Sequence, residues 1–132
     1  MKLIPGITRL TEPYWAGARR SELLIQCCNR CAARWHPPLP RCPGCHSSEV
    51  EWTPVSGRGR VYTYTVVYHP THVAMADRVP YITALIELEE GPKLLTNLRN
   101  CRETDARIDM PVHVIFESLT DEITLPQFEP DR

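Results

Sequence analysis

The sequence lacks any apolar stretch of the length that a membrane-spanning helix needs, which is about 20 residues. At its start, the segment MKLIPGITRL has no apolar run long enough for a signal peptide, because Pro5 and Gly6 interrupt it. Internal repeats and low-complexity segments are also missing. We therefore expect a cytoplasmic protein without a membrane partner. In the reducing cytoplasm, clustered cysteines are more often metal ligands than disulfides.

Glycine is scarce, with six residues against thirteen prolines in a chain of 132. Proline lacks a backbone N–H and clashes with the preceding helical turn, so this composition disfavours long helices and favours short strands and rigid turns. Hydrophobic residues make up 42% and charged residues 23% of the chain, which is the balance of a globular protein with one substantial core. An all-helical fold is disfavoured.

The charge is distributed unevenly although the net charge is only −1. Residues 1–60 carry nine Lys or Arg against four Asp or Glu, whereas residues 61–132 carry six against twelve. The two parts therefore differ as +5 and −6. This asymmetry predicts two units of different character that meet near SGRGR, residues 56–60.

Five of the six cysteines lie in CCNRCAARWHPPLPRCPGCH, residues 27–46. Two CxxC pairs, each on a tight turn, supply four thiolates that can surround a zinc ion: Cys28, Cys31, Cys42 and Cys45. With four protein ligands no position is left for water or substrate, so we predict a single structural Zn²⁺.

Other interpretations of these cysteines are weaker. A thioredoxin-like redox motif needs one CxxC at a helix start in a βαβ setting, which is not present here. Cys27 is an alternative to Cys28 with a poorer spacing, and His46 is more typical of a surface residue than of a ligand. Iron in place of zinc stays open.

After residue 48 the sequence changes to short alternating runs bounded by turn residues, a pattern typical of antiparallel strands. The predicted strands are 60–69, 81–90, 93–100, 111–120 and 122–128. The turn EGPK joins the second and third strands as a hairpin. Five short strands without an intervening helix predict a small closed barrel.

A short helix is expected over residues 11–24, with Thr11 as its cap and Pro13 in its first turn. Tyr14 and Trp15 are costly on a solvent-exposed helix. They either anchor the helix to its own barrel or form a partner interface, and both interpretations stay open.

Several segments together resemble a known family: the helix with YW, then LLIQCCNRC, PPLPRCPGC, EWTPVSGRGRVYTYTVVYHP, PYITALIELEEGPKLLTNL and DMPVHVIFE. In this order the chain is similar to the acyl-CoA-associated OB-fold proteins with an N-terminal rubredoxin-like zinc ribbon, long catalogued as a domain of unknown function. The resemblance covers nearly the whole chain. The expected fold is mainly β, with a helical segment at 1–25, the zinc ribbon at 26–55 and a five-stranded OB-fold barrel at 56–132.

The resemblance implies a noncatalytic subunit of a hetero-oligomer. Its partner would be a thiolase-like or aldolase-like acyl-CoA enzyme, or a hydratase, whose acyl-CoA site it supports in lipid or steroid side-chain metabolism. The four knuckle cysteines match the family's zinc ligands. Two departures affect fine geometry: Ala32 stands where a glycine is common, and Asp109 stands in IDMPV where the family usually has IGMPV.

Ligand contacts outside the ribbon are expected from basic residues. Coenzyme A or an acyl-CoA, shared with the partner, is the candidate ligand of His69 and His72 in the connection 69–80. Arg58 and Arg60 are candidates for its phosphates. Arg19 and Arg20 are candidates for an acidic partner face, together with Tyr14 and Trp15.

Catalysis by this chain alone is not expected, because no nucleophile, base and oxyanion site assemble in the sequence. Cys101 is more typical of a small packing residue than of a nucleophile. The alternative function is binding of single-stranded nucleic acid, with Tyr62, Tyr64 and Tyr68 on one face of a strand. The charge of −6 on residues 61–132 argues against a phosphate-binding groove.

Overall fold

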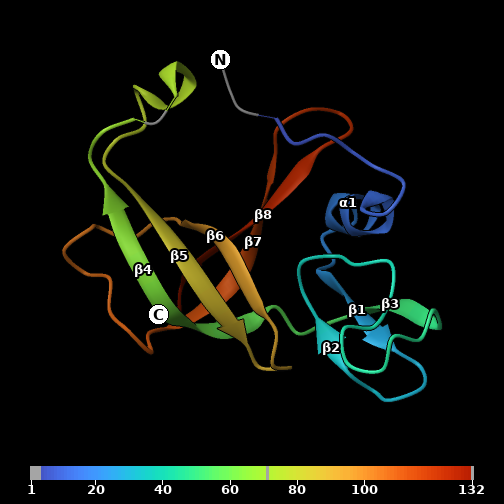
Figure 1. Cartoon of the computed structure of the whole chain (residues 1–132). Coiled ribbons are helices and arrows are strands. Elements are labelled where there is room, and N and C mark those ends of the chain that lie inside the picture. Colours follow the sequence, from blue (N-terminus) through green and yellow to red (C-terminus); the bar gives the residue numbers. More distant parts are fainter. Residues whose placement is uncertain (1–3, 71, 132) are drawn as a thin grey trace.

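The computed structural model describes residues 4–70 and 72–131. It contains one α-helix, a three-stranded sheet and a closed five-stranded barrel (Figure 1). The mainly β class with a zinc-ribbon region followed by an OB-fold barrel is confirmed. Residues 1–3 of the expected helical segment lie outside the described residues. Within the described ranges, no helix has the length and apolar character needed to cross a membrane.

The N-terminal helix α1, Glu12–Arg19, is shorter than the expected 11–24. Ser21 has a φ of 61°, a left-handed conformation that a helix cannot continue through. Thr11 occupies the cap position, but its side chain makes no capping hydrogen bond. The expected cap residue is therefore confirmed, and its hydroxyl oxygen accepts from the Thr8 N–H at 3.0 Å instead of from the helix.

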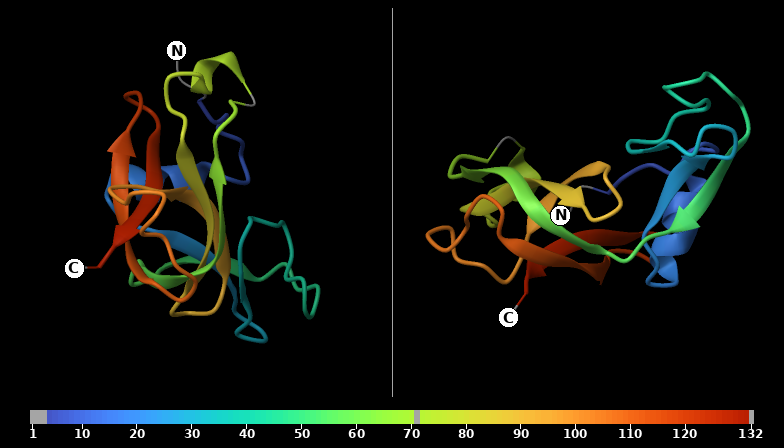
Figure 2. Two further views of the ribbon diagram at one scale, coloured as in Figure 1. Left: turned by 90° about the vertical axis from the view of Figure 1, so that its left-hand side faces the viewer. Right: turned by 90° about the horizontal axis from the view of Figure 1, so that it is seen from below.

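The ribbon sheet consists of β1 (Leu24–Cys28), β2 (Arg34–Trp35) and β3 (Val50–Pro54). The strands are antiparallel in the order β2-β1-β3. Figure 2 shows this sheet, with α1 beside it, at one end of the molecule and the barrel at the other. The two parts are joined through residues 55–57, close to the predicted charge boundary.

The barrel strands are β4 (Arg58–Val67), β5 (Tyr81–Leu88), β6 (Lys93–Leu98), β7 (Pro111–Ser118) and β8 (Thr124–Pro130). They close in the order β4-β5-β6-β8-β7, and β7 pairs back with β4. All five expected strands are therefore confirmed, with ends shifted by a few residues. The β5–β6 hairpin is also confirmed, and the β6–β8 pairing is parallel.

The core fills the barrel with the inward residues of each strand. On β5 the expected alternation places Ile82, Ala84, Ile86 and Leu88 inside. Because transfer of apolar area from water contributes about 25 cal/mol per Å², these side chains favour the closed barrel over a solvated sheet. The connection from β4 to β5 contains one short 3₁₀ helix, η1, Val73–Met75.

Candidate metal centre and surrounding surfaces

Two matching turns bring the four ribbon cysteines together. In the first, the Cys28 sulfur accepts from the backbone N–H groups of Arg30 and Cys31 at 3.4 and 3.5 Å. In the second, the Cys42 sulfur accepts from Gly44 and Cys45 at 3.3 and 3.4 Å. Each turn thus stabilises a thiolate with two N–H dipoles before any metal binds.

The sulfur geometry fits a tetrahedral metal ion. Sγ–Sγ distances are 3.6 Å for Cys28–Cys45 and 3.5 Å for Cys31–Cys42, and all four atoms lie within 4.8 Å of one another. Sulfurs bound tetrahedrally to zinc at about 2.3 Å stand about 3.8 Å apart. A disulfide would need about 2.05 Å. The donor set therefore fits zinc better than disulfide bonding, and iron bound by four thiolates stays open.

The surroundings of the ribbon cysteines distinguish the four candidate ligands from Cys27. Cys28 and Cys42 are buried beside Trp35 in a small core of their own. Cys27, whose side chain alternates to the other side of β1, is not among the four clustered cysteines. The N–H groups of Cys45 and Gly44 lower the pKa of Cys42 to about 6. A thiol with this pKa is ready to bind metal at neutral pH.

Tyr14 and Trp15 are both 9% exposed and belong to the main core. Their rings meet edge to face with centroids 5.1 Å apart, and Tyr14 also stacks obliquely on His36 at 5.5 Å. Burial raises the pKa of Tyr14 and lowers that of His36 to about 4. The two aromatic residues therefore anchor α1 internally, and a partner could reach only the edges that line a neighbouring groove.

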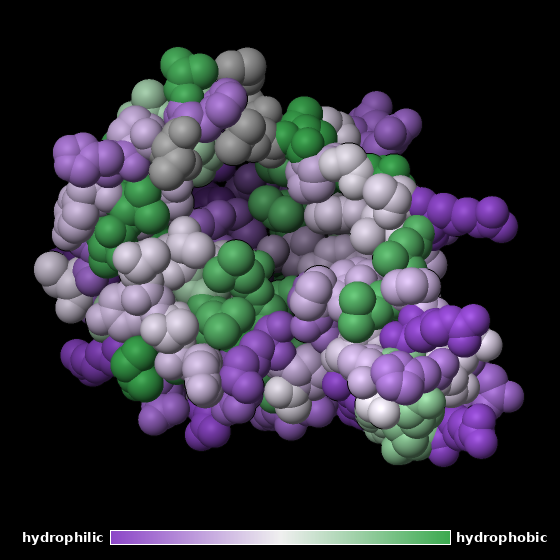
Figure 3. Space-filling view, viewed as in Figure 1, coloured by the Kyte–Doolittle hydropathy of each residue, from purple (hydrophilic) through white to green (hydrophobic). Residues whose placement is uncertain are grey.

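That groove, of about 300 Å³, separates the helix and ribbon from the barrel. Leu95 on β6 lines it and is 70% exposed. Hydrophobic residues gather on this side of the barrel in the space-filling view (Figure 3). Of the two arginines expected at a partner surface, Arg19 donates to the Glu122 carbonyl at 2.9 Å, and Arg20 pairs with Glu22 at 3.6 Å.

The two arginines expected at coenzyme A phosphates already have acidic neighbours. Arg58 lies 3.2 Å from Glu89, and Arg60 lies 2.7 Å from Glu87. Both pairs are on the surface, where solvent and salt weaken ion pairs, so a phosphate can compete with the carboxylates. As ligand contacts these arginines stay a prediction.

The two histidines expected near the ligand have different environments. His69 is exposed, whereas the Nδ1 of His72 accepts from the Ala74 N–H at 2.9 Å and thereby caps η1. Cys101 packs against the barrel core, and its thiol donates to the Arg102 carbonyl at 3.4 Å. The position of Cys101 agrees with a packing role.

The three tyrosines of the nucleic-acid alternative do not share a face. The β4–β5 register shifts between Val61 and Thr63, which leaves Tyr62 as an extra residue and turns the following side chains over. Tyr64 consequently packs on the core, and its hydroxyl donates to the Ala106 carbonyl at 3.0 Å. Tyr62 and Tyr68 are exposed. The expected row of three stacking aromatics is therefore wrong.

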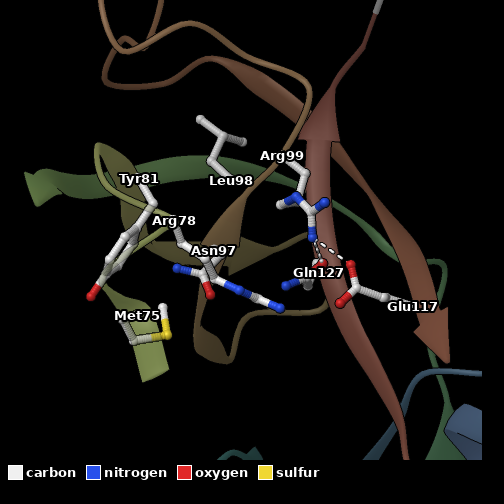
Figure 4. A pocket seen from close by; sticks show the side chains of 8 residues that line it. All are labelled: Met75, Arg78, Tyr81, Asn97, Leu98, Arg99, Glu117 and Gln127. Atoms are coloured by element: carbon white, nitrogen blue, oxygen red, sulfur yellow. Dashed lines mark hydrogen bonds and ion pairs between the residues drawn. The ribbon is translucent and has the colours of Figure 1, made fainter. Parts of the chain in front are cut away.

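Sequence reasoning missed a second cavity, of about 380 Å³, at the end of the barrel beneath the 69–80 connection (Figure 4). Its lining comes from four strands and the connection: Met75, Arg78, Tyr81, Asn97, Leu98, Arg99, Glu117 and Gln127. These positions are spread over more than fifty residues of sequence and form no local motif. Only the fold brings them together.

Two family models match the chain. Residues 15–51 match the ChsH2 rubredoxin-like zinc ribbon domain, and residues 52–117 match the ChsH2 C-terminal OB-fold domain. The two matches adjoin in β3, a few residues before the expected boundary at 55/56, which stays a prediction.

Several curated proteins are similar over most of the chain. A DUF35 domain-containing scaffold protein of Methanocaldococcus jannaschii is 36% identical over 72% of this chain and 67% of its own length. A probable enoyl-CoA hydratase alpha subunit of Thermomonospora curvata is 39% identical over 96% of this chain. The 3-oxo-4,17-pregnadiene-20-carboxyl-CoA hydratase alpha subunit of Mycobacterium tuberculosis is 35% identical over 97% of this chain. The chain spans only about two fifths of the length of either hydratase subunit, 39% and 40%.

Two solved structures are similar to the chain over most of its length. A chain of the Ltp2-ChsH2(DUF35) aldolase superposes with a TM-score of 0.86 and 38% identity, covering 96% of this chain and 98% of that one. A DUF35 protein of unknown function from Sulfolobus solfataricus, 15% identical with a TM-score of 0.64, shares the fold. The chain therefore belongs to the ChsH2/DUF35 family, which combines a rubredoxin-like zinc ribbon with a C-terminal OB-fold domain.

Proposed function

We propose that this chain is the noncatalytic accessory part of an acyl-CoA enzyme complex. It binds a thiolase-like or aldolase-like subunit and supports that subunit's acyl-CoA site in lipid or steroid side-chain metabolism. One observation carries the proposal: the chain matches almost the whole of one component of the Ltp2-ChsH2(DUF35) aldolase, at 38% identity. The names of the two hydratase alpha subunits support the same class of complex.

The chemistry of the chain's own residues supports a noncatalytic role. Four thiols are gathered at the metal centre, and the Cys101 thiol faces a backbone carbonyl. His36 packs on Tyr14, and both ring nitrogens of His113 are held by carboxylates, Asp131 at 2.6 Å and Glu129 at 2.9 Å. These groups serve structure, so the reacting groups would lie in the partner.

The groove between ribbon and barrel is the proposed contact for the acyl-CoA enzyme. In this arrangement α1 and the ribbon form a docking arm, and the barrel supplies the second wall. Leu95 lines that groove with 70% of its area exposed. Apolar surface that gathers beside a groove and is bordered by polar residues is a common feature of protein-binding sites.

Co-purification tests this proposal. The tagged, zinc-loaded chain is used to recover proteins from the source organism's lysate, with half of the sample treated with nuclease. The proposal expects an acyl-CoA thiolase, aldolase or hydratase in stoichiometric amount, insensitive to nuclease, and turnover only when that protein and this chain are combined. Turnover by the chain alone would contradict the noncatalytic role, and recovery of nucleic acid without such an enzyme would favour the alternative.

A matched pair of variants tests the docking surface. Leu95→Asp places a charge in the groove, whereas Ile108→Asp makes the same kind of change on the loop between β6 and β7, where Ile108 is 55% exposed. Leu95→Asp is expected to weaken recovery of the enzyme by at least tenfold, because a buried unpaired charge opposes association. Ile108→Asp is expected to leave it unchanged. Equal losses would show that this groove is not the interface.

A further inference from the structure

The cavity beneath the 69–80 connection holds a cation whose side chain has no acidic partner among the described residues. Arg78 lines the cavity and is only partly exposed, and its guanidinium makes no hydrogen bond or ion pair within residues 4–70 and 72–131. Figure 4 shows the side chain extending across the cavity toward Gln127. A partly desolvated guanidinium without a counter-ion is unfavourable, and an anion in the cavity would offset that cost.

A second donor faces the same space. Gln127 is 2% exposed, and its amide oxygen accepts from Arg99 at 2.8 Å, which fixes the orientation of the amide. The amide nitrogen therefore points away from Arg99 (Figure 4), and the one side-chain hydrogen bond of Gln127 to a described residue is the bond that its oxygen accepts from Arg99. Arg78 and Gln127 together form a donor-only pair from two separate elements. Such a pair is complementary to an acceptor that carries negative charge.

The charges around the cavity limit the size of that negative charge. Arg99 is paired with one Glu117 oxygen at 2.5 Å, and the formal charges of Arg78, Arg99 and Glu117 sum to +1. The other Glu117 oxygen is buried and has no hydrogen-bond partner among the described residues, so Glu117 keeps a negative edge in the cavity. A dianion such as a phosphate monoester would meet repulsion from Glu117. The arrangement matches a monoanion, and a carboxylate is the monoanion that a guanidinium binds through two parallel N–H groups.

Met75 and Tyr81 supply apolar wall, and Asn97 adds a polar side chain, whereas the Leu98 side chain points away into the barrel core (Figure 4). The cavity volume of about 380 Å³ lies within the range of small-molecule sites, about 300–1,000 Å³. A flexible thioether beside an aromatic ring adapts to aliphatic and aromatic ligands alike. The body of the ligand is thus hydrophobic and about as large as an aromatic ring or a short acyl chain.

We infer that this cavity binds a small organic monocarboxylate, with its carboxylate on Arg78 and Gln127 and its apolar body against Met75 and Tyr81. The site lies in this chain alone and does not depend on the proposed acyl-CoA enzyme partner. A carboxylate can also come from an acidic side chain of a partner protein, and the experiment separates the two sources.

The test is a titration of the full zinc-loaded chain followed by two-dimensional amide NMR, with benzoate and hexanoate as probes. Benzamide tests the need for charge, and inorganic phosphate tests the preference for a carboxylate. The inference expects saturable shifts around Arg78, Tyr81, Leu98 and Gln127 with benzoate or hexanoate, and binding at least tenfold weaker with benzamide and phosphate. Shifts that are absent, unsaturable or equal for benzamide would overturn it.

Two variants sharpen the result. Arg78→Gln removes the proposed counter-ion and is expected to weaken benzoate binding by tenfold or more. Arg107→Gln removes an equal charge from an exposed position outside the cavity and is expected to leave binding unchanged. The NMR spectrum of each variant reports whether the fold is retained, and Arg78→Met, which also removes the charge, replaces Arg78→Gln if that variant does not fold. Equal binding by both variants would contradict the site.

The two sources of carboxylate differ in the presence of a partner. If Arg78→Gln blocks assembly with a purified partner while the isolated chain does not bind benzoate or hexanoate, the cavity receives a protein side chain and the small-molecule inference fails. Retained probe binding in the assembled complex supports it. Failure to assemble with any acyl-CoA enzyme would remove the proposed function but would leave the titration of the isolated chain intact.

Discussion

Ala32 and His46 have the same left-handed backbone conformation, with φ angles of 63° and 65°, and each directly follows the second cysteine of its CxxC turn. The Ala32 N–H donates to the Cys28 carbonyl at 2.9 Å, and the His46 N–H donates to the Cys42 carbonyl at 3.0 Å. A CxxC turn of this type therefore requires a residue with positive φ after it. This explains why alanine at position 32, in place of a glycine, is a costly choice.

Replacing Ala32 with glycine should stabilise the zinc-loaded protein. The left-handed conformation costs an L-residue about 1–2 kcal/mol, which glycine avoids. Glycine also makes the unfolded chain more flexible, which lowers the stability of the fold by part of that amount. We therefore expect a net increase in the free energy of unfolding of about 0.5 kcal/mol or more. Chemical denaturation measures the difference. Ala76→Gly is the matched control, because Ala76 has a φ of −60°. It should lose about 0.5–1 kcal/mol. Two changes of the same sign would contradict this account of the turn.

Replacing Cys42 with serine should release the metal. The purified variant is expected to contain no stoichiometric zinc by plasma mass spectrometry, whereas Cys27→Ser should keep an equimolar amount because Cys27 lies outside the four-sulfur cluster. The fluorescence of Trp35, which is buried beside Cys28 and Cys42, should change only in the first variant. Loss of metal should also abolish partner binding. Binding that survives without metal would rule out the ribbon as a docking arm.

Acidification should destabilise the fold through His36. Burial lowers the pKa of His36 to about 4, below its ordinary value of 6.5, so the unfolded chain takes up the proton first as the pH falls. Between pH 7.5 and 5.5 this should remove about 1 kcal/mol of stability. The hydrogen bond with Asp131, assisted by Glu129, raises the pKa of His113, whose contribution is present below pH 6.5 and is lost as the pH rises.

Because the two histidines act in opposite directions, the measurement compares variants. Denaturation of the wild type and of His36→Gln at pH 7.5 and 5.5 isolates the contribution of His36, since His113 is common to both. The His36→Gln variant should lose less free energy of unfolding than the wild type when the pH falls from 7.5 to 5.5. Identical pH dependence of the two proteins would show that His36 is not the buried base.

Replacing Gly59 with alanine should weaken the barrel where β4 pairs with both β5 and β7. A Cβ at this position would lie 2.5 Å from the backbone oxygen of Glu87, which cannot rotate away as a side chain would. Overpacking of this kind costs about 1–3 kcal/mol. Gly6→Ala is the control, because no atom lies within 4 Å of its added Cβ. Equal melting temperatures for the two variants would be inconsistent with the close approach.

The barrel strands could be predicted because their alternation directly records which side chains face inward. The alternation in β5 corresponds to Ile82, Ala84, Ile86 and Leu88, all buried. Alternation cannot detect an inserted residue, however. The bulge at Tyr62 therefore turned Tyr64 from the expected outer face to the core.

The ends of α1 and the cavity around Arg78 could not be predicted, for different reasons. The helix ends where Ser21 adopts a positive φ, and serine is not a residue type that indicates a left-handed conformation. The cavity depends on where the 69–80 connection folds over the barrel, and that is decided by tertiary packing. In contrast, the spacing within each CxxC pair fixes a tight turn that places its two sulfurs side by side. The cluster of four cysteines was therefore predictable from the sequence.

The position of β8 between β6 and β7 has a consequence for the order of events during synthesis. The strand pairs of the ribbon all lie within residues 24–54, so this sheet can form on its metal before the barrel, whereas Leu23 and Ile25 gain their core contacts only when the barrel strands have formed. Strands β4, β5 and β6 emerge next as a meander with two open edges. Only when residues 124–130 emerge can β8 pair with both β6 and β7 and close the barrel. Until then the nascent barrel has unpaired strand edges, which chaperones can recognise.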